Sequence, residues 1–279
     1  MPLDLEVLER KATTTSNKKK ATPILLVHGY WHGAWCWEET FMPYFAQMGY
    51  DVYAVSLRGH GNSPLPKHQT SLWSVRLADY VQDVKTVIDQ KFPVKSFLIG
   101  HSLGGMVVQK YLEQEDPDHS LSGAVLLASV PGNGMSWTAG VLDPLRKHPW
   151  LLLKANLTGN LLGLVNTSDL AREYFFTPDT PQAFVEGWVP HLQKDSYLAF
   201  LDVLLWKPVQ LDQVRNKKIL VVGSDKDKFV TVDEFHATAK AYGGEEALIF
   251  EGMPHHLMVA PGWERVAEAI ADWFERAYE

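Results

Sequence analysis

The sequence predicts an α/β protein with a mostly parallel central sheet and helices on both faces of that sheet. Two observations carry this prediction. Short runs that are apolar throughout alternate with segments of helical periodicity, as expected when parallel strands are buried on both faces. Glycine-rich stretches follow several of these runs, and ligand sites in such sheets lie at the C-terminal ends of the strands. One long segment without strand patterns, residues 131–209, interrupts the alternation.

The alternation is clearest in the first 130 residues. We predict strands over residues 3–11, 23–27, 51–55, 97–99 and 124–128. We predict helices over residues 37–48 and 77–88 and a third helix that begins just after Ser102. The apolar residues of the second helix recur with the spacing of an amphipathic helix. A polar loop over residues 13–20 is expected to join the first two strands.

The second half of the chain divides into an insertion and a return to the sheet. Residues 131–209 contain short helical pieces rich in Leu and Trp, separated by prolines, and we interpret them as a helical lid over the site. Strands are predicted over 219–223 and 247–250, with helices over 233–242 and 263–274. The predicted core domain therefore comprises residues 1–130 and 210–279.

Composition limits the classes of protein to consider. The 279 residues are 46% hydrophobic and 21% charged, which is typical of a soluble globular protein. The net charge of −7 argues against a nucleic-acid partner. Cys36 is the only cysteine, so no intramolecular disulfide is possible. No apolar run approaches the ~20 residues of a membrane span, and the N-terminus does not resemble a signal peptide. We expect a cytoplasmic monomer or homodimer.

The strongest functional motif is Gly100-His101-Ser102-Leu103-Gly104. It lies between a predicted strand and a predicted helix, which is the setting of a nucleophile elbow. In that setting the serine occupies a strained turn that exposes its hydroxyl at the edge of the sheet. Glycines on either side let the strand and the helix approach closely. The pattern predicts Ser102 as a catalytic nucleophile.

A serine hydroxyl needs a base to become a nucleophile at neutral pH. In this architecture the triad partners follow in the order acid and then histidine, each after a late strand. The loop after residue 222 contains Asp225 and Asp227, and the loop after residue 250 contains His255 and His256. The order is correct, but the pattern alone does not choose within either pair.

These motifs, together with Val27-His28-Gly29 and the run from Arg58 to Ser63, resemble the α/β-hydrolase superfamily, specifically its capped serine esterases and lipases. The resemblance implies that Asp227 is the acid, because an apolar pair follows it, and that His255 is the base. It places the oxyanion-hole N–H groups at Tyr30 and Leu103. It also implies a small-molecule ester substrate and no cofactor.

The remaining candidates near the site concern binding and support. An inner face built from apolar lid residues would line a pocket for apolar, medium-length acyl chains, and we expect Trp31, Trp188 and Trp206 to contact the substrate. We expect His256 to be exposed or to contact the lid. Four further histidines, which we interpret as structural and not as metal ligands, are His28, His32, His60 and His101.

Three alternative functions belong to the same fold. Residues 28–35 also resemble hydroxynitrile lyases and the related plant methyl esterases. Those lyases carry Thr at the position of Gly29 and Lys at that of His256, so both departures favour an esterase. Cofactor-free perhydrolases usually carry Met at the position of Leu103. A non-catalytic small-ligand receptor is the third alternative, and turnover of any ester would exclude it.

Overall fold

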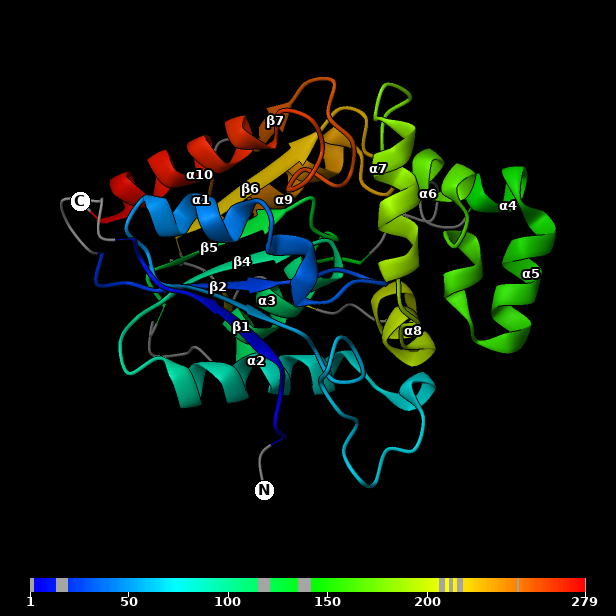
Figure 1. Cartoon of the computed structure of the whole chain (residues 1–279), viewed down its shortest axis with the longest axis horizontal. Helices are drawn as coiled ribbons and strands as arrows, with labels where there is room; N and C mark the ends of the chain where they lie inside the picture. The colour runs from blue at the N-terminus through cyan, green and yellow to red at the C-terminus, as the bar shows by residue number, and fades with distance from the viewer. Residues whose placement is uncertain are drawn as a thin grey trace.

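A seven-stranded sheet forms the centre of the computed structural model (Figure 1). The structure describes residues 3–13, 20–114, 121–134, 142–205, 209–210, 213–214, 218–244 and 246–278. The strand order is β1-β3-β2-β4-β5-β6-β7. The strand β1 runs antiparallel to β3, and every other neighbouring pair is parallel. The predicted mostly parallel sheet is therefore confirmed.

The strands agree with the apolar runs of the sequence. Their bounds are β1 Val7–Arg10, β2 Ile24–Val27, β3 Val52–Val55, β4 Phe97–His101, β5 Gly123–Leu127, β6 Ile219–Ser224 and β7 Leu248–Phe250. All residues of β2, β3, β4 and β5 are buried, which explains why these strands are apolar throughout instead of alternating. The edge strand β1 is shorter than the predicted span 3–11. The predicted loop over 13–20 lies mostly outside the described residues.

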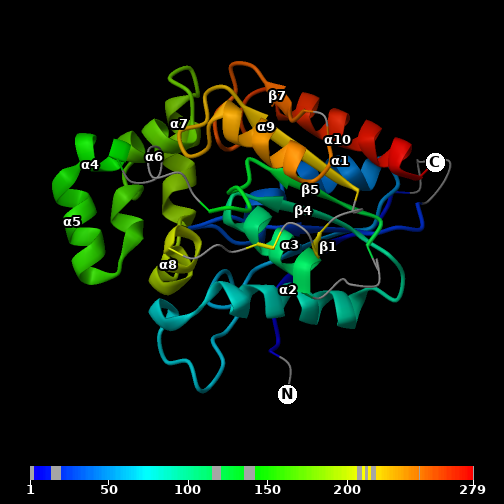
Figure 2. The ribbon, with the colours of Figure 1, turned by 180° about the vertical axis from the view of Figure 1, so that it is seen from behind.

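Helices cover both faces of the sheet, as predicted. Figures 1 and 2 show α1 (Phe41–Gln47) and α10 (Trp263–Tyr278) on one face and α2 (Leu77–Lys91), α3 (Leu103–Gln114) and α9 (Val232–Ala241) on the other. The predicted helix over 37–48 is split into a 3-10 turn, η1 (Ala34–Trp37), and α1. A second 3-10 turn, η2 (Leu72–Ser74), precedes α2.

The described part of the segment between β5 and β6 contains helices joined by loops and no strand. Its elements are α4 Asp143–Lys147, α5 Pro149–Thr158, η4 Leu161–Leu164, α6 Ser168–Phe175, α7 Gln182–Trp188, η5 Val189–His191 and α8 Tyr197–Leu205. Figure 1 shows these helices beyond the end of the sheet toward which the parallel strands point. The insertion therefore lies where the sequence places the functional loops. None of the helices described here is long and apolar enough to cross a membrane.

Candidate active site

Ser102 occupies a strained turn between β4 and α3. Its φ of +53° lies in the left-handed region, which is unfavourable for a residue with a side chain. A Cβ on Gly100 would lie 2.4 Å from the carbonyl oxygen of Gly104, and a Cβ on Gly104 would lie 2.4 Å from the carbonyl oxygens of Val27 and His28. Only glycine fits at these two positions, so the local sequence allows the close packing that holds the turn.

The backbone beside Ser102 presents candidate donors for an oxyanion. Leu103 is the first residue of α3, where a backbone N–H has no acceptor within its own helix. The turn that contains Tyr30 follows β2 and lies directly against the serine, since a Cβ on Gly29 would be 2.8 Å from the Cβ of Ser102. Both predicted oxyanion positions therefore flank the strained turn.

The two acidic residues of the loop after β6 have different environments. Asp227 Oδ2 lies 2.7 Å from His255 Nδ1, and neither side chain is more than 3% exposed. Its Oδ1 accepts hydrogen bonds from the backbone N–H groups of Phe229 (2.8 Å) and Val230 (3.1 Å). Asp225 is exposed, accepts from the N–H of Gly252 and pairs with Lys226. Of these two aspartates, only Asp227 is hydrogen-bonded to a histidine.

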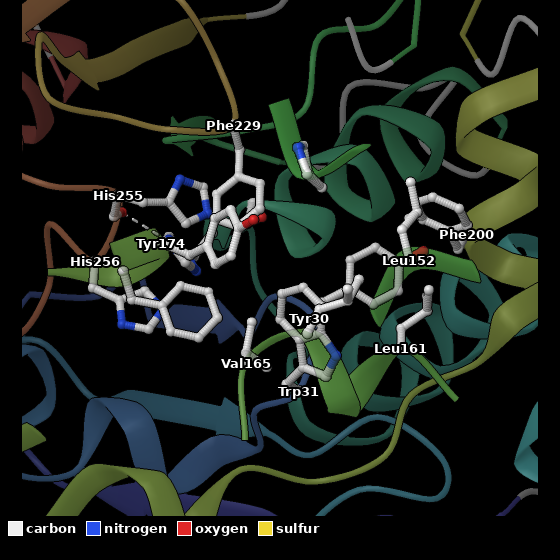
Figure 3. Close-up of a pocket in the computed structure, with 15 residues that line it drawn as sticks. Tyr30, Trp31, Leu152, Leu161, Val165, Tyr174, Phe200, Phe229, His255 and His256 are labelled. Carbon is white, nitrogen blue, oxygen red and sulfur yellow. Dashed lines mark hydrogen bonds between the residues drawn. The ribbon is translucent and has the colours of Figure 1, made fainter. Parts of the chain in front are cut away.

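His255 and Ser102 line one cavity (Figure 3). The ring of His255 packs against Phe229 at 4.7 Å and His101 at 4.8 Å between ring centroids. The backbone carbonyl of His255 accepts a hydrogen bond of 3.1 Å from His101 Nε2. Packing on two sides and a fixed backbone thus hold the imidazole between Asp227 and the cavity.

The walls of the cavity are mainly apolar and aromatic, and the inserted helices supply about half of them. The lining residues are Tyr30, Trp31, His101, Ser102, Pro144, Leu152, Leu161, Leu164, Val165, Tyr174, Phe175, Phe200, Phe229, His255 and His256. Trp31 is thus a wall residue, as its candidate binding role requires. Such a cavity suits an organic ligand with a large apolar part.

A second predicted substrate contact, Trp188, is not among the described residues that line the cavity. The indole of Trp188 instead packs against Trp35 with ring centroids 4.7 Å apart, and its Nε1–H donates to His32 Nε2 at 3.2 Å. The indole thus lies beside the turn after β2, and its contact with the substrate stays a prediction. Trp206 lies outside the described residues.

His256 is fully buried and forms part of the cavity wall. Its ring stacks on Phe175 of α6 with centroids 4.3 Å apart and an interplanar angle of 14°. The expected contact with the inserted helices is present, and the alternative of an exposed ring is wrong. Burial, helped by the neighbouring histidines, holds the pKa of His256 well below its ordinary value. The ring is therefore neutral at physiological pH.

Three of the remaining histidines are buried and neutral. Burial lowers the pKa of His28 to about 3 and that of His32 to about 4, and it holds the pKa of His101 well below its ordinary value. His28 Nδ1 donates to the carbonyl of Gly29 at 2.8 Å, and its Nε2 accepts from the N–H of Leu57 at 3.0 Å. These contacts tie neighbouring loops together, in agreement with a structural role.

His60 differs from the other buried histidines because it has an acidic neighbour. Its Nε2 lies 3.2 Å from Asp195 Oδ2, and both side chains are 1% exposed. Burial opposes the charged ring, yet the carboxylate of Asp195 raises the pKa of His60 above its ordinary value. Sequence reasoning did not identify Asp195, because a single aspartate in a helical insertion carries no motif.

The described residues contain no group of three or more His, Cys, Asp or Glu side chains arranged to hold a metal ion. The polar groups at the cavity include one strained serine, one histidine bonded to a buried carboxylate, and backbone N–H groups. This set can activate a hydroxyl and stabilise a developing oxyanion.

Comparison with known proteins agrees with this chemistry. A profile described as the alpha/beta hydrolase family matches residues 24–269. The chain is 29% identical over 170 residues to a putative chloroplastic methylesterase 15 of Arabidopsis thaliana, which covers 57% of this chain and 36% of that protein. It is 32% identical over 116 residues to a carbendazim hydrolyzing esterase of a Nocardioides species, covering 41% of this chain and 45% of that one.

These sequence matches are partial, because the chain spans less than half the length of the curated relatives it matches. Solved structures extend the similarity to the whole fold. The crystal structure of a monoacylglycerol lipase from Paleococcus ferrophilus has a TM-score of 0.70 and 19% identity, covering 99% of this chain and 100% of that one. This likeness concerns the fold, and it confirms the predicted fold class.

Proposed function

Because the chain belongs to the alpha/beta hydrolase family, we propose that it is a serine hydrolase that cleaves carboxylic esters through an acyl-enzyme intermediate. The observation that carries the proposal is the convergence of three features at one cavity: the left-handed turn at Ser102, the imidazole of His255, and the buried Asp227 bonded to that imidazole. A hydroxyl at a strained turn and a base oriented by an acid are the parts that acyl transfer needs.

In the proposed mechanism, His255 takes the proton of Ser102 as the serine oxygen attacks the ester carbonyl carbon. Asp227 keeps the imidazole in the required orientation and stabilises its cation. The N–H groups of Tyr30 and Leu103 stabilise the oxyanion of the tetrahedral intermediate. His255 then gives its proton to the leaving alcohol, and a water molecule activated by the same base releases the acid.

We further propose that residues 131–209 act as a cap that binds the acyl group. Eight of the residues that line the cavity come from this segment, and none of the eight carries a formal charge. An apolar pocket gains about 0.8 kcal/mol for each CH₂ group that it buries, until the pocket is full. The preferred substrates are therefore esters of apolar, medium-length acids, while acetate esters and charged substrates are poor.

A panel of p-nitrophenyl esters from acetate to palmitate tests the reaction and its residues. Ser102→Ala and His255→Ala should each lower kcat by on the order of 10⁴- to 10⁶-fold, since both groups act in the same step. Retained turnover in Ser102→Ala would overturn the mechanism. An absence of turnover of every ester by the wild-type protein would overturn the function and favour a receptor.

The acyl pocket can be tested by narrowing it from α5. Leu152 lines the cavity, whereas Leu157 on the same helix is 78% exposed and does not. Leu152→Trp should shift the maximum of kcat/KM toward shorter acyl chains, because the indole fills space that the chain would occupy. Leu157→Trp is the matched control and should keep the wild-type profile. An identical profile in both variants would show that α5 does not contact the acyl chain.

A further inference from the structure

The residues between η5 and α8 hold both backbone polar groups of Trp31. The N–H of Trp31 donates to Asp195 Oδ2 at 3.0 Å, and its carbonyl accepts from the N–H of Gln193 at 2.8 Å. The side chain of Gln193 in turn accepts from the N–H of Gly61 at 2.8 Å. A short stretch of the inserted segment therefore fixes the turn after β2, although the two are far apart in the sequence.

Trp31 needs such support because its backbone is strained. Its φ is +64°, and a residue with a side chain in the left-handed region costs roughly 1–2 kcal/mol. Conformations of this kind persist where the surroundings determine them. Tyr30, whose N–H is a proposed oxyanion donor, immediately precedes Trp31. The conformation at Trp31 thus sets the course of the turn that carries this donor.

The carboxylate of Asp195 is built into the core with a full set of partners. Besides Trp31, it accepts hydrogen bonds from the Tyr80 hydroxyl at 3.0 Å and from the N–H of Ser196 at 2.7 Å. The remaining partner is His60 Nε2 at 3.2 Å. Burial opposes ionisation, but His60 and the two backbone N–H groups lower the pKa of Asp195 below its ordinary value. The carboxylate is therefore an anion that cannot move without leaving several donors unpaired.

We infer that Asp195, paired with His60, is a positioning residue that holds the oxyanion-hole turn in its active conformation from the inserted segment. This inference rests on the proposed function. Asp195 acts through the Trp31 backbone and does not itself line the cavity. Since the oxyanion exists only in the transition state and the intermediate, a misplaced Tyr30 N–H should reduce kcat and leave KM nearly unchanged.

Asp202 offers a matched control for the loss of a buried carboxylate. It also belongs to the inserted segment, in α8, and it also bonds to the core. Its Oδ2 accepts from Arg76 Nε at 2.8 Å and from the N–H of Leu77 at 3.0 Å. These contacts anchor the inserted segment at the start of α2 and involve no backbone group of the turn after β2. Removal of Asp202 should therefore affect folding and attachment of the segment but not the oxyanion donors.

The experiment compares kcat, KM and the rate at which a p-nitrophenyl phosphonate labels Ser102. Asp195→Ala should lower kcat by on the order of 10- to 100-fold, with KM within about threefold of wild type. Labelling should slow in parallel, because the phosphoryl oxygen occupies the oxyanion hole. Asp195→Asn keeps one acceptor oxygen for the Trp31 N–H and should recover about twofold of the lost kcat. Asp202→Ala should keep kcat within about threefold of wild type.

The outcomes separate this inference from the proposed function. If wild type turns over esters and Ser102→Ala does not, but Asp195→Ala and Asp202→Ala have equal kcat, the inference is wrong while the function stands. An increase in KM with an unchanged kcat in Asp195→Ala would also overturn the inference. If Asp195→Ala fails to fold, Asp195→Asn must still lower kcat at least threefold more than Asp202→Asn. If wild type cleaves no ester, the proposed function itself fails.

Discussion

The two aspartates of the loop after β6 illustrate how much a single residue depends on its surroundings. Both precede the same short apolar pair, so the residue pattern leaves the choice between them open, and only the family resemblance favours Asp227. The structure buries Asp227 against His255 and surrounds its other oxygen with two backbone donors, whereas Asp225 is exposed beside Lys226. A carboxylate that orients an imidazole must be fixed in this way, and the exposed one is not.

Exchanging each acid for its amide tests this difference. Asp227→Asn should lower kcat by on the order of 10³- to 10⁴-fold, because an amide presents a donor and favours the wrong imidazole tautomer. Asp225→Asn is the matched control and should stay near wild type. Steady-state kinetics on one medium-chain ester is sufficient. A larger loss in Asp225→Asn would show that the exposed residue is the acid.

Single residues were predictable where a motif surrounds them. Ser102 and His255 follow strands with recognisable glycine or histidine patterns, and the structure brings both to one cavity. Trp188 is a large apolar residue of the insertion, but its position beside Trp35 and His32 depends on packing that no local pattern indicates. Asp195 could not be found, because its partners Trp31, Tyr80 and His60 come from three distant segments.

At the scale of the elements, the junction of β4 and α3 determines the site. Strand and helix meet so closely that a methyl group on Gly104 would lie 2.4 Å from two backbone oxygens at the end of β2. Backbone atoms at the end of a central strand cannot shift to make room for an added methyl group, whereas the end of a flexible side chain can. The tight contact therefore couples Ser102 to the turn after β2 through the packing of β2, β4 and α3.

Substituting glycines in two helices measures this constraint. Gly104→Ala should lower the free energy of unfolding by about 3 kcal/mol through overpacking. Gly187 lies in α7 with no atom within 4 Å of an added Cβ, so Gly187→Ala should instead raise it by roughly 0.5–1 kcal/mol. Urea unfolding at pH 7.5 gives both values. Equal effects at the two sites would contradict the close approach at the elbow.

Elements were predictable where one physical requirement controls them. Central strands buried on both faces must be apolar throughout, so β2, β3, β4 and β5 were recognised nearly to the residue. The sequence does not predict the length of the edge strand β1 or the split between η1 and α1. The pairing of an edge strand with its one neighbour and the break before Phe41 both depend on contacts with other elements. Prolines indicated short helices in the insertion but not their packing.

At the scale of the whole molecule, the fold keeps a group of histidines neutral near the site. His28, His32, His101 and His256 are buried, and burial depresses each pKa, to about 3 for His28 and about 4 for His32. In the unfolded chain a histidine titrates near ~6.5. The unfolded state therefore binds more protons below that pH. This contribution to stability is present above ~6.5 and is lost as the pH falls toward the folded values.

Removing one of these rings should reduce the loss of stability in acid. His256→Phe keeps the stacking on Phe175 and removes a titrating group, so the decrease in unfolding free energy between pH 7 and pH 5 should shrink by roughly 2 kcal/mol. His68→Phe, at an exposed site, is the control. Urea unfolding at the two pH values measures both. If the unfolding free energy decreases between pH 7 and pH 5 by the same amount in His256→Phe as in wild type, the ring of His256 is not buried in its neutral form.

The contribution of His60 to the pH dependence of stability has the opposite sign. Because Asp195 raises its pKa in the folded protein, its stabilisation is present below the unfolded value and is lost as the pH rises through the folded one. The four neutral rings outnumber it, so the net effect of these buried histidines is destabilisation in acid. The sequence predicted that these histidines are structural, but the sign of each shift depends on burial and on Asp195.

If the protein is the proposed ester hydrolase, Ser102 is its nucleophile. Mass spectrometry of the intact protein and of its peptides after treatment with a fluorophosphonate tests this assignment. We expect one covalent adduct per chain, located on Ser102, in parallel with loss of ester turnover, and no adduct in Ser102→Ala. An adduct on another residue, or full turnover by protein that is completely labelled at Ser102, would contradict it.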